Sequence, residues 1–232
     1  MTLVRHGQAS YLSEDYDKLS PLGERQSRVL GEHWAHNGIR FDEVYYGPRN
    51  RQIRTGEIVG ECFGSDWPDP IVLDEFDEYR AEELYRYCLP ELARTDPRIG
   101  ELAAALYEAS LEDRPRAFER VFQEMTRRWV MGEIGSPKVE PWAAFRVRVH
   151  SALASIRSKA RRGCRIAVFT SAGPISTAVQ LALDLSDTKA LELSWLVRNG
   201  SCNDFLFSGE RFSLGTFNTH SHLRSSELIT YR

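Results

Sequence analysis

A short apolar run at the start of the chain predicts a buried β-strand. Residues 2–4, which are Thr, Leu and Val, form this run, and β-branched residues are typical of strands. The polar residues 11–19 predict a loop. Ser20 followed by Pro21 has the form of a helix N-cap with proline in the first helical position. Asn37, with the glycine after it, predicts the end of that helix.

Similar patterns along the chain predict further strands and helices. Strands are predicted at residues 41–46, 71–73, 165–170, 202–207 and 211–217, and the strand at 71–73 is expected to be buried. Helices are expected to start at Gly47 with Pro48, at Pro141, and after Ser171, where Pro174 would take the first position. Spaced apolar residues mark the buried side of the helix from Pro141: Trp142, Phe145, Val149, Leu153 and Ile156.

Residues 79–135 carry no strand pattern. Three helical stretches are predicted there instead, at residues 79–93, 97–111 and 115–132. Apolar stripes along these stretches are typical of helices that pack on one another or cover another part of a protein. We therefore expect residues 79–135 to form a helical insertion.

Length, charge and cysteine content narrow the class of protein. The 232 residues suffice for one large α/β domain or two small ones. A net charge of −3, from 30 basic and 33 acidic side chains, gives no reason to expect nucleic acid or an anionic membrane as partner. No apolar run approaches membrane length, and Met1 leads straight into the first strand, so we expect no signal peptide. Four well-separated cysteines suit reduced thiols in a cytoplasm: Cys62, Cys88, Cys164 and Cys202.

The residues that follow the first strand carry the most specific chemistry. Arg5 and His6 stand at its end, where open α/β sheets have their ligand crevices. Gly7 then provides a turn that a residue with a Cβ atom would resist. A guanidinium group offers a planar fork for phosphate oxygens, and an imidazole can attack phosphorus or move a proton.

This stretch and two later ones resemble the motifs of the histidine phosphatase superfamily, which has the phosphoglycerate mutase-like fold. Arg-His-Gly after an N-terminal strand is the first motif of that family. Residues 19–26, Leu-Ser-Pro-Leu-Gly-Glu-Arg-Gln, are similar to its Leu-Thr-x-x-Gly-x-x-Gln segment. Residues 47–56 are similar to its Ser-Pro-x-x-Arg-x-x-x-Thr-Ala motif, with Gly47 in place of Ser and Gly56 in place of Ala. The resemblance extends to about Phe217, with the motifs in family order.

The resemblance implies a fold and a domain organisation. We expect a three-layer α/β/α fold with a mostly parallel central sheet. Residues 1–232 would form a single domain, with the helical insertion at about 79–135 as a cap over the site. In this family the insertion is the part that varies with the substrate.

The resemblance also implies a reaction, which is hydrolysis of a phosphomonoester through a phosphohistidine at His6. Arg51 falls on the phosphate-binding arginine of the family, and Arg5 and the helix start near Gly173 would help it hold the phosphoryl oxygens. Glu75 stands at the acid of the family's Leu-x-Glu and is the expected proton donor. Its acidic neighbours are rivals for that role: Asp74, Asp77 and Glu78.

One position departs from the family pattern. The turn after the strand at 165–170 normally carries a second catalytic histidine, whereas this chain has Ser171 there, with Ala172 where glycine is common. Serine donates one neutral hydrogen bond, so we expect slow turnover unless a cation compensates, and His222, Arg54 and Arg198 are candidates. The expected phosphate-binding residues are Arg5, Gln8, Arg51, Arg54, Ser171, Ala172, Gly173 and His222.

The remaining expectations concern metals, the phosphoryl acceptor and partners. His33 and His36 lie three positions apart without a further ligand at metal-binding spacing, so we expect neither metal nor cofactor. Water as acceptor makes a phosphatase, and a second phosphorylated substrate makes a mutase. We favour a phosphatase because residues 8–12, Gln-Ala-Ser-Tyr-Leu, lack the mutase-like Glu-Ser-x-x-x-Asn pattern. The alternative from another class is a phospho-ligand binder without turnover. The partner would be a small phosphorylated substrate, contacted in addition by Arg198 and Asn199, and the protein a monomer or homodimer.

Overall fold

A computed structural model describes residues 1–10 and 17–231, so residues 11–16 of the predicted loop lie outside the described residues. The chain divides into two compact units. The first consists of Met1–Glu78 and Arg148–Arg232, and the second of Tyr79–Val147. No helix among the described residues is both long enough and apolar enough to span a membrane.

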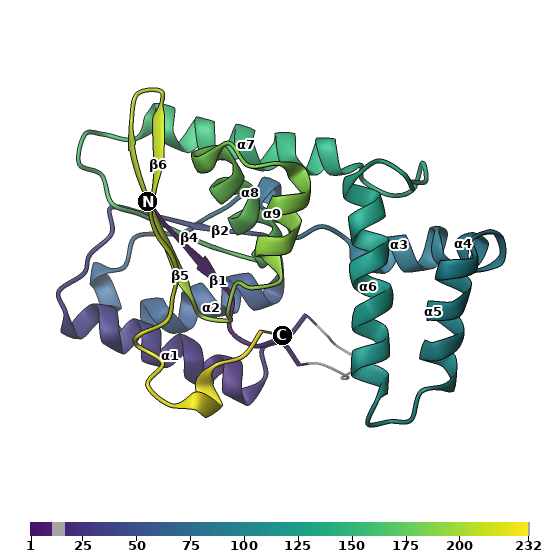
Figure 1. Ribbon diagram of the computed structural model, residues 1–232. Helices are drawn as coiled ribbons and strands as arrows, with labels where there is room; N and C mark the ends of the chain where they lie inside the picture. The colour runs from purple at the N-terminus through teal and green to yellow at the C-terminus, as the bar shows by residue number, and fades with distance from the viewer. Residues whose placement is uncertain (11–16, 232) are drawn as a thin grey trace. The chain divides into compact units, whose positions relative to one another are not determined.

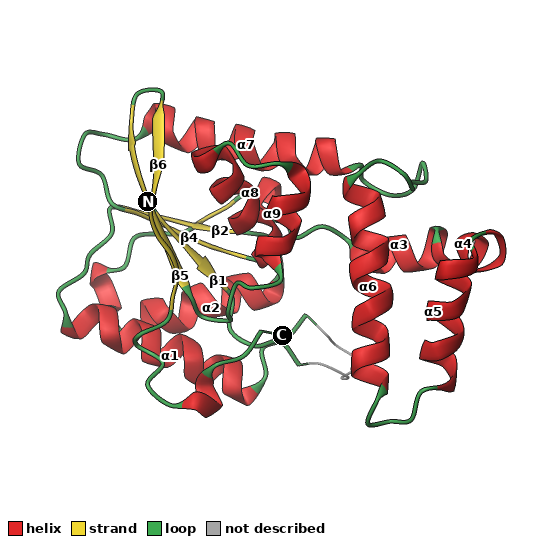
Figure 2. Cartoon of the chain, in the orientation of Figure 1, coloured by secondary structure: helices red, strands yellow, loops and turns green. Residues whose placement is uncertain are grey.

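A β-sheet forms the centre of the first unit (Figures 1 and 2). In the described residues it has six strands in the order β3-β2-β4-β1-β5-β6. The first four strands of this order are parallel, and β5 and β6 run antiparallel. The mostly parallel sheet that the sequence predicts is thereby confirmed. The strands are β1 (Thr2–Arg5), β2 (Glu43–Tyr46), β3 (Ile71–Val72), β4 (Ile166–Thr170), β5 (Cys202–Ser208) and β6 (Arg211–Thr219).

Helices cover both faces of the sheet, which gives the three layers of the expected fold (Figure 1). α1 (Pro21–His36) and α2 (Asn50–Glu61) lie on one face. The end of α7 (Trp142–Lys159) lies on the other, together with α8 (Ala172–Leu183) and α9 (Asp187–Ser194). The predicted cap residues of α1 are confirmed, because the Ser20 hydroxyl accepts from Gly23 N and the C-cap is Asn37.

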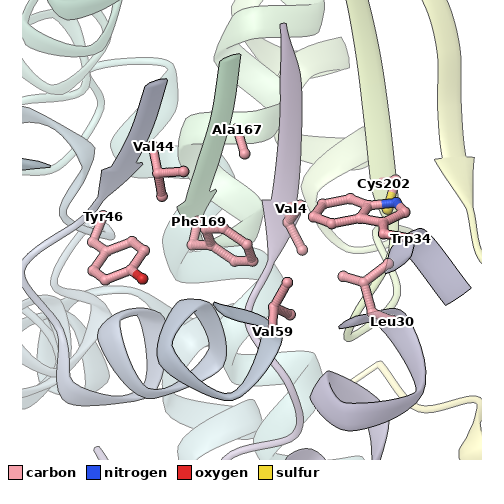
Figure 3. Packing of buried hydrophobic residues seen from close by; sticks show 9 residues of the cluster. All are labelled: Val4, Leu30, Trp34, Val44, Tyr46, Val59, Ala167, Phe169 and Cys202. Atoms are coloured by element: carbon pink, nitrogen blue, oxygen red, sulfur yellow. The ribbon is translucent and has the colours of Figure 1, made fainter. Parts of the chain in front are cut away.

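The core between the sheet and α1 and α2 holds the strand ends in place (Figure 3). β4 is buried along its whole length because it lies between β1 and β2. The ring of Phe169 packs edge-on against Tyr46, with the ring centroids 5.6 Å apart, and against Trp34, at 6.2 Å. The cluster consists of Val4, Leu30, Trp34, Val44, Tyr46, Val59, Ala167, Phe169 and Cys202.

Three details differ from the sequence-based expectations. The prediction that the strand at 71–73 is buried is wrong: Ile71 and Val72 are 51% and 49% exposed, because β3 is an edge strand paired only with β2. α2 begins at Asn50 rather than at Gly47. α8 begins at Ala172, so Pro174 stands in the third helical position and not in the first.

The second unit is helical in its described structure. It contains α3 (Ala81–Tyr87), α4 (Leu89–Thr95), α5 (Pro97–Glu108), α6 (Arg114–Val130) and the start of α7. The helix predicted at 79–93 is two helices, since Pro90 lies in the first turn of α4 and lacks the N–H that an uninterrupted helix would need. Residues of four elements are buried in this unit: Leu84, Ile99, Val121, Met125, Trp129 and Phe145. The role of the insertion as a cap stays a prediction.

Candidate active site

The carboxyl ends of β1, β2 and β4 bring the expected motifs together. Arg5 and Thr170 are register partners in β1 and β4, and His6 N donates to Thr170 O at 2.9 Å. Gly47 N, directly after β2, donates to Phe169 O at 2.9 Å. Loops that follow adjacent parallel strands meet at one edge of a sheet, where α/β proteins bind their ligands.

Gly7 determines the path of the chain directly after His6. Its N–H donates to Thr55 Oγ1 of α2 at 3.0 Å. A Cβ atom on Gly7 would lie only 2.3 Å from the carbonyl oxygen of Gly23 in α1. Because that obstacle is backbone, no larger residue fits here without moving the chain. The close packing of Gly7 against both helices thus fixes the chain directly after His6.

Hydrogen bonds define the tautomer of the buried His6 ring. Nδ1 lies 2.7 Å from the carbonyl oxygen of Gly7, which can only accept, so Nδ1 carries the proton. Arg51 Nε donates to His6 Nε2 at 3.1 Å. Nε2 therefore presents its lone pair, which is the form of imidazole that can attack phosphorus.

The surroundings also keep this ring uncharged. Burial lowers the pKa of His6 well below its usual value, and the nearby charges of Arg51, Arg5 and Arg49 lower it further. Only the hydrogen bond to the carbonyl oxygen of Gly7 opposes them. The His6 ring is thus neutral at neutral pH, and its Nε2 carries no proton.

Three arginines surround His6, and sequence analysis assigned a site role to only two of them. Arg5 donates through Nη1 to the carbonyl oxygen of Val197, and Arg51 is 5% exposed. The third is Arg49, whose Nε lies 2.5 Å from Asp77 Oδ1. The signal for it was present in the sequence, because cations are unfavourable in the first turn of a helix unless an anion faces them.

A buried hydrogen-bond network surrounds Ser171, the position at which the sequence led us to expect the second histidine of the family. Ser171 is completely buried, and its Oγ accepts from Gln52 Nε2 at 2.7 Å. Gln52 also donates to the carbonyl oxygen of Phe76 at 3.2 Å, and its Oε1 accepts from Arg49 N. A Cβ atom on Gly47 would lie 2.2 Å from Gln52 Oε1. Because Ser171 is inaccessible, the expectation that its hydroxyl binds a phosphoryl oxygen is not supported.

The start of α8 is an anion-binding feature that a protein carboxylate fills. Glu78 Oε2 accepts from Gly173 N at 3.1 Å, and Ala172 beside it is buried. Glu75, the expected proton donor, has an exposed side chain. Its carbonyl oxygen accepts from Arg148 Nη1 at 2.7 Å. The 3₁₀ turn at Asp74–Phe76 separates the two glutamates, so the structure brings Glu78 and not Glu75 to the helix start.

The sequence pattern of the histidine phosphatase superfamily (branch 1) matches this chain in two overlapping segments, residues 1–97 and 80–220. The chain belongs to the histidine phosphatase superfamily. The match includes the strand ends with Arg5 and His6, the start of α2 with Arg51, and the start of α8 with Gly173.

Solved structures of this superfamily share the fold. A phosphoglycerate mutase from Bacillus anthracis is similar with a TM-score of 0.64 at 16% identity, covering 97% of this chain and 95% of that one. A phosphoserine phosphatase mutant from Entamoeba histolytica, in complex with phosphoserine, has a TM-score of 0.61 at 17% identity, covering 96% and 98%. A mycobacterial glucosyl-3-phosphoglycerate phosphatase with inorganic phosphate has a TM-score of 0.63 at 15% identity, covering 96% and 98%.

Two of the expected phosphate-binding residues of this chain form other contacts. The side chain of Gln8 accepts from Ser20 Oγ at 2.8 Å, at the start of α1. Arg54 forms ion pairs with Glu57 and Glu61 on the exposed side of α2, each at 3.2 Å. Both side chains support local structure in the described residues rather than the group around His6.

His222 does not supply the compensating cation. Its ring is buried, with Nε2 3.0 Å from the carbonyl oxygen of Gly200 and the ring centroid 5.8 Å from that of His33. Burial, helped by the neighbouring His33, lowers the pKa of His222 to about 4. The ring is therefore neutral at neutral pH, and its Nε2–H braces the loop of Gly200, whose own N–H donates to Arg5 O at 3.0 Å.

The two further candidates for substrate contact differ in their surroundings. Asn199 is completely buried and donates through Nδ2 to the carbonyl oxygen of His6 at 3.2 Å, so it braces the backbone of His6. The guanidinium of Arg198 stacks over the ring of Tyr231, 5.2 Å from its centroid. Among the described residues, no group of three or more His, Cys, Asp or Glu side chains is arranged to hold a metal ion.

The buried state of His222 leads to a prediction about acid stability. In the unfolded chain a histidine titrates near pH 6.5. Between pH 6.5 and 4 the unfolded state therefore binds the additional proton, and the free energy of unfolding decreases as the pH is lowered. The shift corresponds to a loss of about 3 kcal/mol over this window. His222→Gln keeps a donor for Gly200 O, so we expect it to lose less stability on acidification than the native protein. Urea unfolding at pH 7 and pH 4.5 measures this; equal losses in both proteins would contradict it.

Proposed function

We propose that the protein is a phosphatase that hydrolyses a small phosphomonoester through a phosphohistidine on His6. The observation that carries this proposal is the state of the His6 ring: uncharged, protonated on Nδ1, and with the Nε2 lone pair facing Arg51. A histidine in a purely structural position has no need of an arginine donating to its lone pair. The family membership and the phosphatases among the structural relatives support the same proposal.

In the first step the Nε2 lone pair attacks phosphorus, and the bond from phosphorus to the leaving oxygen breaks. Arg51 Nε gives up its hydrogen bond to Nε2 and takes a phosphoryl oxygen instead, which moves a charge-assisted bond to the place where negative charge develops. The phosphorylated ring keeps its proton on Nδ1, held by the Gly7 carbonyl oxygen. That bond stabilises the positive ring of the intermediate.

We propose Arg49 as the additional cation of this site, in the role that the sequence left to His222, Arg54 or Arg198. Arg49 is close enough to lower the pKa of His6 through its charge. Its partner Asp77 directly follows Phe76, whose carbonyl oxygen accepts from Thr170 Oγ1 and Gln52 Nε2 next to Ser171. Arg49 would thus lie on the same side of the site as Ser171, where we expect the second histidine of the family.

We propose Glu78 as the group that protonates the leaving oxygen and then takes a proton from the attacking water. It lies at the helix start that would bind a phosphoryl oxygen, 3.1 Å from Gly173 N. When a phosphoryl oxygen takes that N–H, the side chain is released next to the reacting groups, where in its protonated form it gives its proton to the leaving oxygen and becomes a carboxylate. In the second step water attacks the phosphohistidine, Glu78 accepts its proton, and phosphate leaves with His6 neutral again.

Transfer to a second phosphorylated molecule, as in a mutase, would use the same first step. The segment after His6, which lacks the mutase-like pattern, favours water as the acceptor. The substrate itself is proposed only as a small phosphorylated molecule.

A rapid-quench experiment tests the nucleophile. With a labelled phosphomonoester and a metal chelator present, we expect an acid-labile, base-stable phosphoryl adduct on the peptide that contains His6. His6→Ala should form no adduct and should turn over slower by a factor of about 10³ or more, since the covalent route is lost. Normal turnover without an adduct, or activity that requires added metal, would contradict the mechanism; adduct formation without turnover would favour a mutase or a binding protein.

A pair of isosteric variants tests the proton donor. Glu78→Gln should reduce kcat by about 10²–10⁴-fold on an alkyl phosphate, the usual contribution of general acid catalysis. The reduction should be much smaller on p-nitrophenyl phosphate, whose leaving group needs no proton. Glu75→Gln, the exposed control, should change kcat little on either substrate. The opposite pattern would restore Glu75 as the proton donor.

A second pair of variants, at two arginines at the start of α2, tests Arg49. Removing a donor to the transition state typically costs about 10²–10³ in kcat, so we expect this loss for Arg49→Gln and a smaller one for Arg49→Lys. Arg54→Gln is the matched control, because Arg54 is paired with glutamates on the exposed side of α2. If Arg49 serves only to hold Asp77, then Asp77→Asn should reproduce the full loss, and the proposed role would be wrong.

A further inference from the structure

A carboxylate of the protein itself occupies the donors next to the nucleophile. Asp17 Oδ1 accepts from Arg51 Nη1 at 2.9 Å. Its other oxygen, Oδ2, accepts from Asn50 N, the first N–H of α2, at 2.8 Å. Arg51 in turn donates through Nε to His6 Nε2. One arginine side chain therefore connects the Asp17 carboxylate directly to the atom that would bond to phosphorus.

These two donors form the kind of set that binds a phosphoryl group. An arginine fork and the first N–H of a helix are both favourable partners for phosphate oxygens, and the helix dipole adds to the attraction. α2 has no acidic residue in its first turn. Arg49 and Arg51 stand at that end of the helix, where cations are unfavourable unless an anion faces them. Asp17 supplies that anion from a segment distant in sequence.

We propose that Asp17 competes with the phosphoryl group of the substrate for Arg51 and the Asn50 N–H. It is then a residue that sets affinity for phosphate in the proposed phosphatase, and this inference rests on the proposed function. When the substrate binds, Arg51 exchanges the carboxylate oxygen for a phosphoryl oxygen. When phosphate is the product, the carboxylate takes the arginine back.

This exchange affects the two anions of the reaction differently. A substrate has further groups with which it can bind, whereas inorganic phosphate has only its oxygens. A competing carboxylate costs both anions the same binding free energy. This cost is a larger share of the smaller total binding free energy of inorganic phosphate, which favours product release. Its negative charge also repels a phosphate that approaches the same arginine.

The proposal is tested by titrating the protein with inorganic phosphate and with orthovanadate. Calorimetry and inhibition of turnover measure the binding. Asp17→Asn keeps the shape of the side chain but removes its charge. We expect the Kd of phosphate to fall by about tenfold or more, the value of one like charge removed from beside a bound anion. Asp66→Asn is the matched control, because Asp66 faces Arg40 at 3.9 Å on the exposed surface and its replacement removes the same net charge. The Kd of phosphate for this variant should equal that for the native protein.

An unchanged or higher Kd in Asp17→Asn would overturn the proposal; a higher one would mean that Asp17 orients Arg51 for the ligand. Asp17→Ala provides a second variant, and melting temperatures show whether either variant remains folded. Failure of the proposed function has a different signature. In that case the native protein forms no His6 adduct and neither protein binds phosphate, whereas failure of this inference alone leaves the adduct and the binding intact.

Discussion

The hydrogen bond from Arg51 Nε to His6 Nε2 is the interaction on which the site depends. It joins two buried side chains, each of which is 5% exposed. A buried guanidinium beside a buried imidazole is tolerable only if the imidazole is neutral, and its lone pair must then face the cation. The Gly7 carbonyl oxygen completes the arrangement by holding the proton on Nδ1. The charge, tautomer and direction of the His6 ring are thus determined together by groups of the protein itself.

The rest of the fold serves to place these two side chains. The register of β1 against β4 positions His6, while the contact of Phe169 O with Gly47 N positions the loop that leads into α2 and Arg51. Gly47 and Ser171, two positions at which we expected departures from the family motifs, are coupled by Gln52. A Cβ atom on Gly47 would collide with Gln52 Oε1, and the amide of Gln52 donates to Ser171. Introducing a histidine at 171 alone would displace Gln52 and its other bonds, so Gly47, Gln52 and Ser171 form one packed unit.

The sequence was sufficient wherever a motif lies on a regular element. Arg5, His6 and Arg51 follow predictable strands or begin a predictable helix, and the structure brings them together as expected. It was insufficient where side-chain direction depends on a short turn or on tertiary packing. The 3₁₀ turn at Asp74–Phe76 directs Glu78 rather than Glu75 to the start of α8, and no pattern distinguishes the two in the sequence. The burial of His222 depends on contacts with Gly200 and His33, both distant in the chain. The break of the helix at 79–93 could have been predicted, since Pro90 marks it directly.

The charge balance of the site also affects the stability of the fold. Arg49, Arg51 and the start of α8 each face a carboxylate, of Asp77, Asp17 and Glu78 respectively. Without these partners the cations and the start of α8 would repel one another, and an unpaired charge on the buried Arg51 would be costly. A phosphoryl group carries enough oxygens and charge to take over more than one of these contacts. On the proposed function, binding a phosphomonoester is an exchange of anions, and the affinity for a phosphate ligand is the difference between two similar interactions.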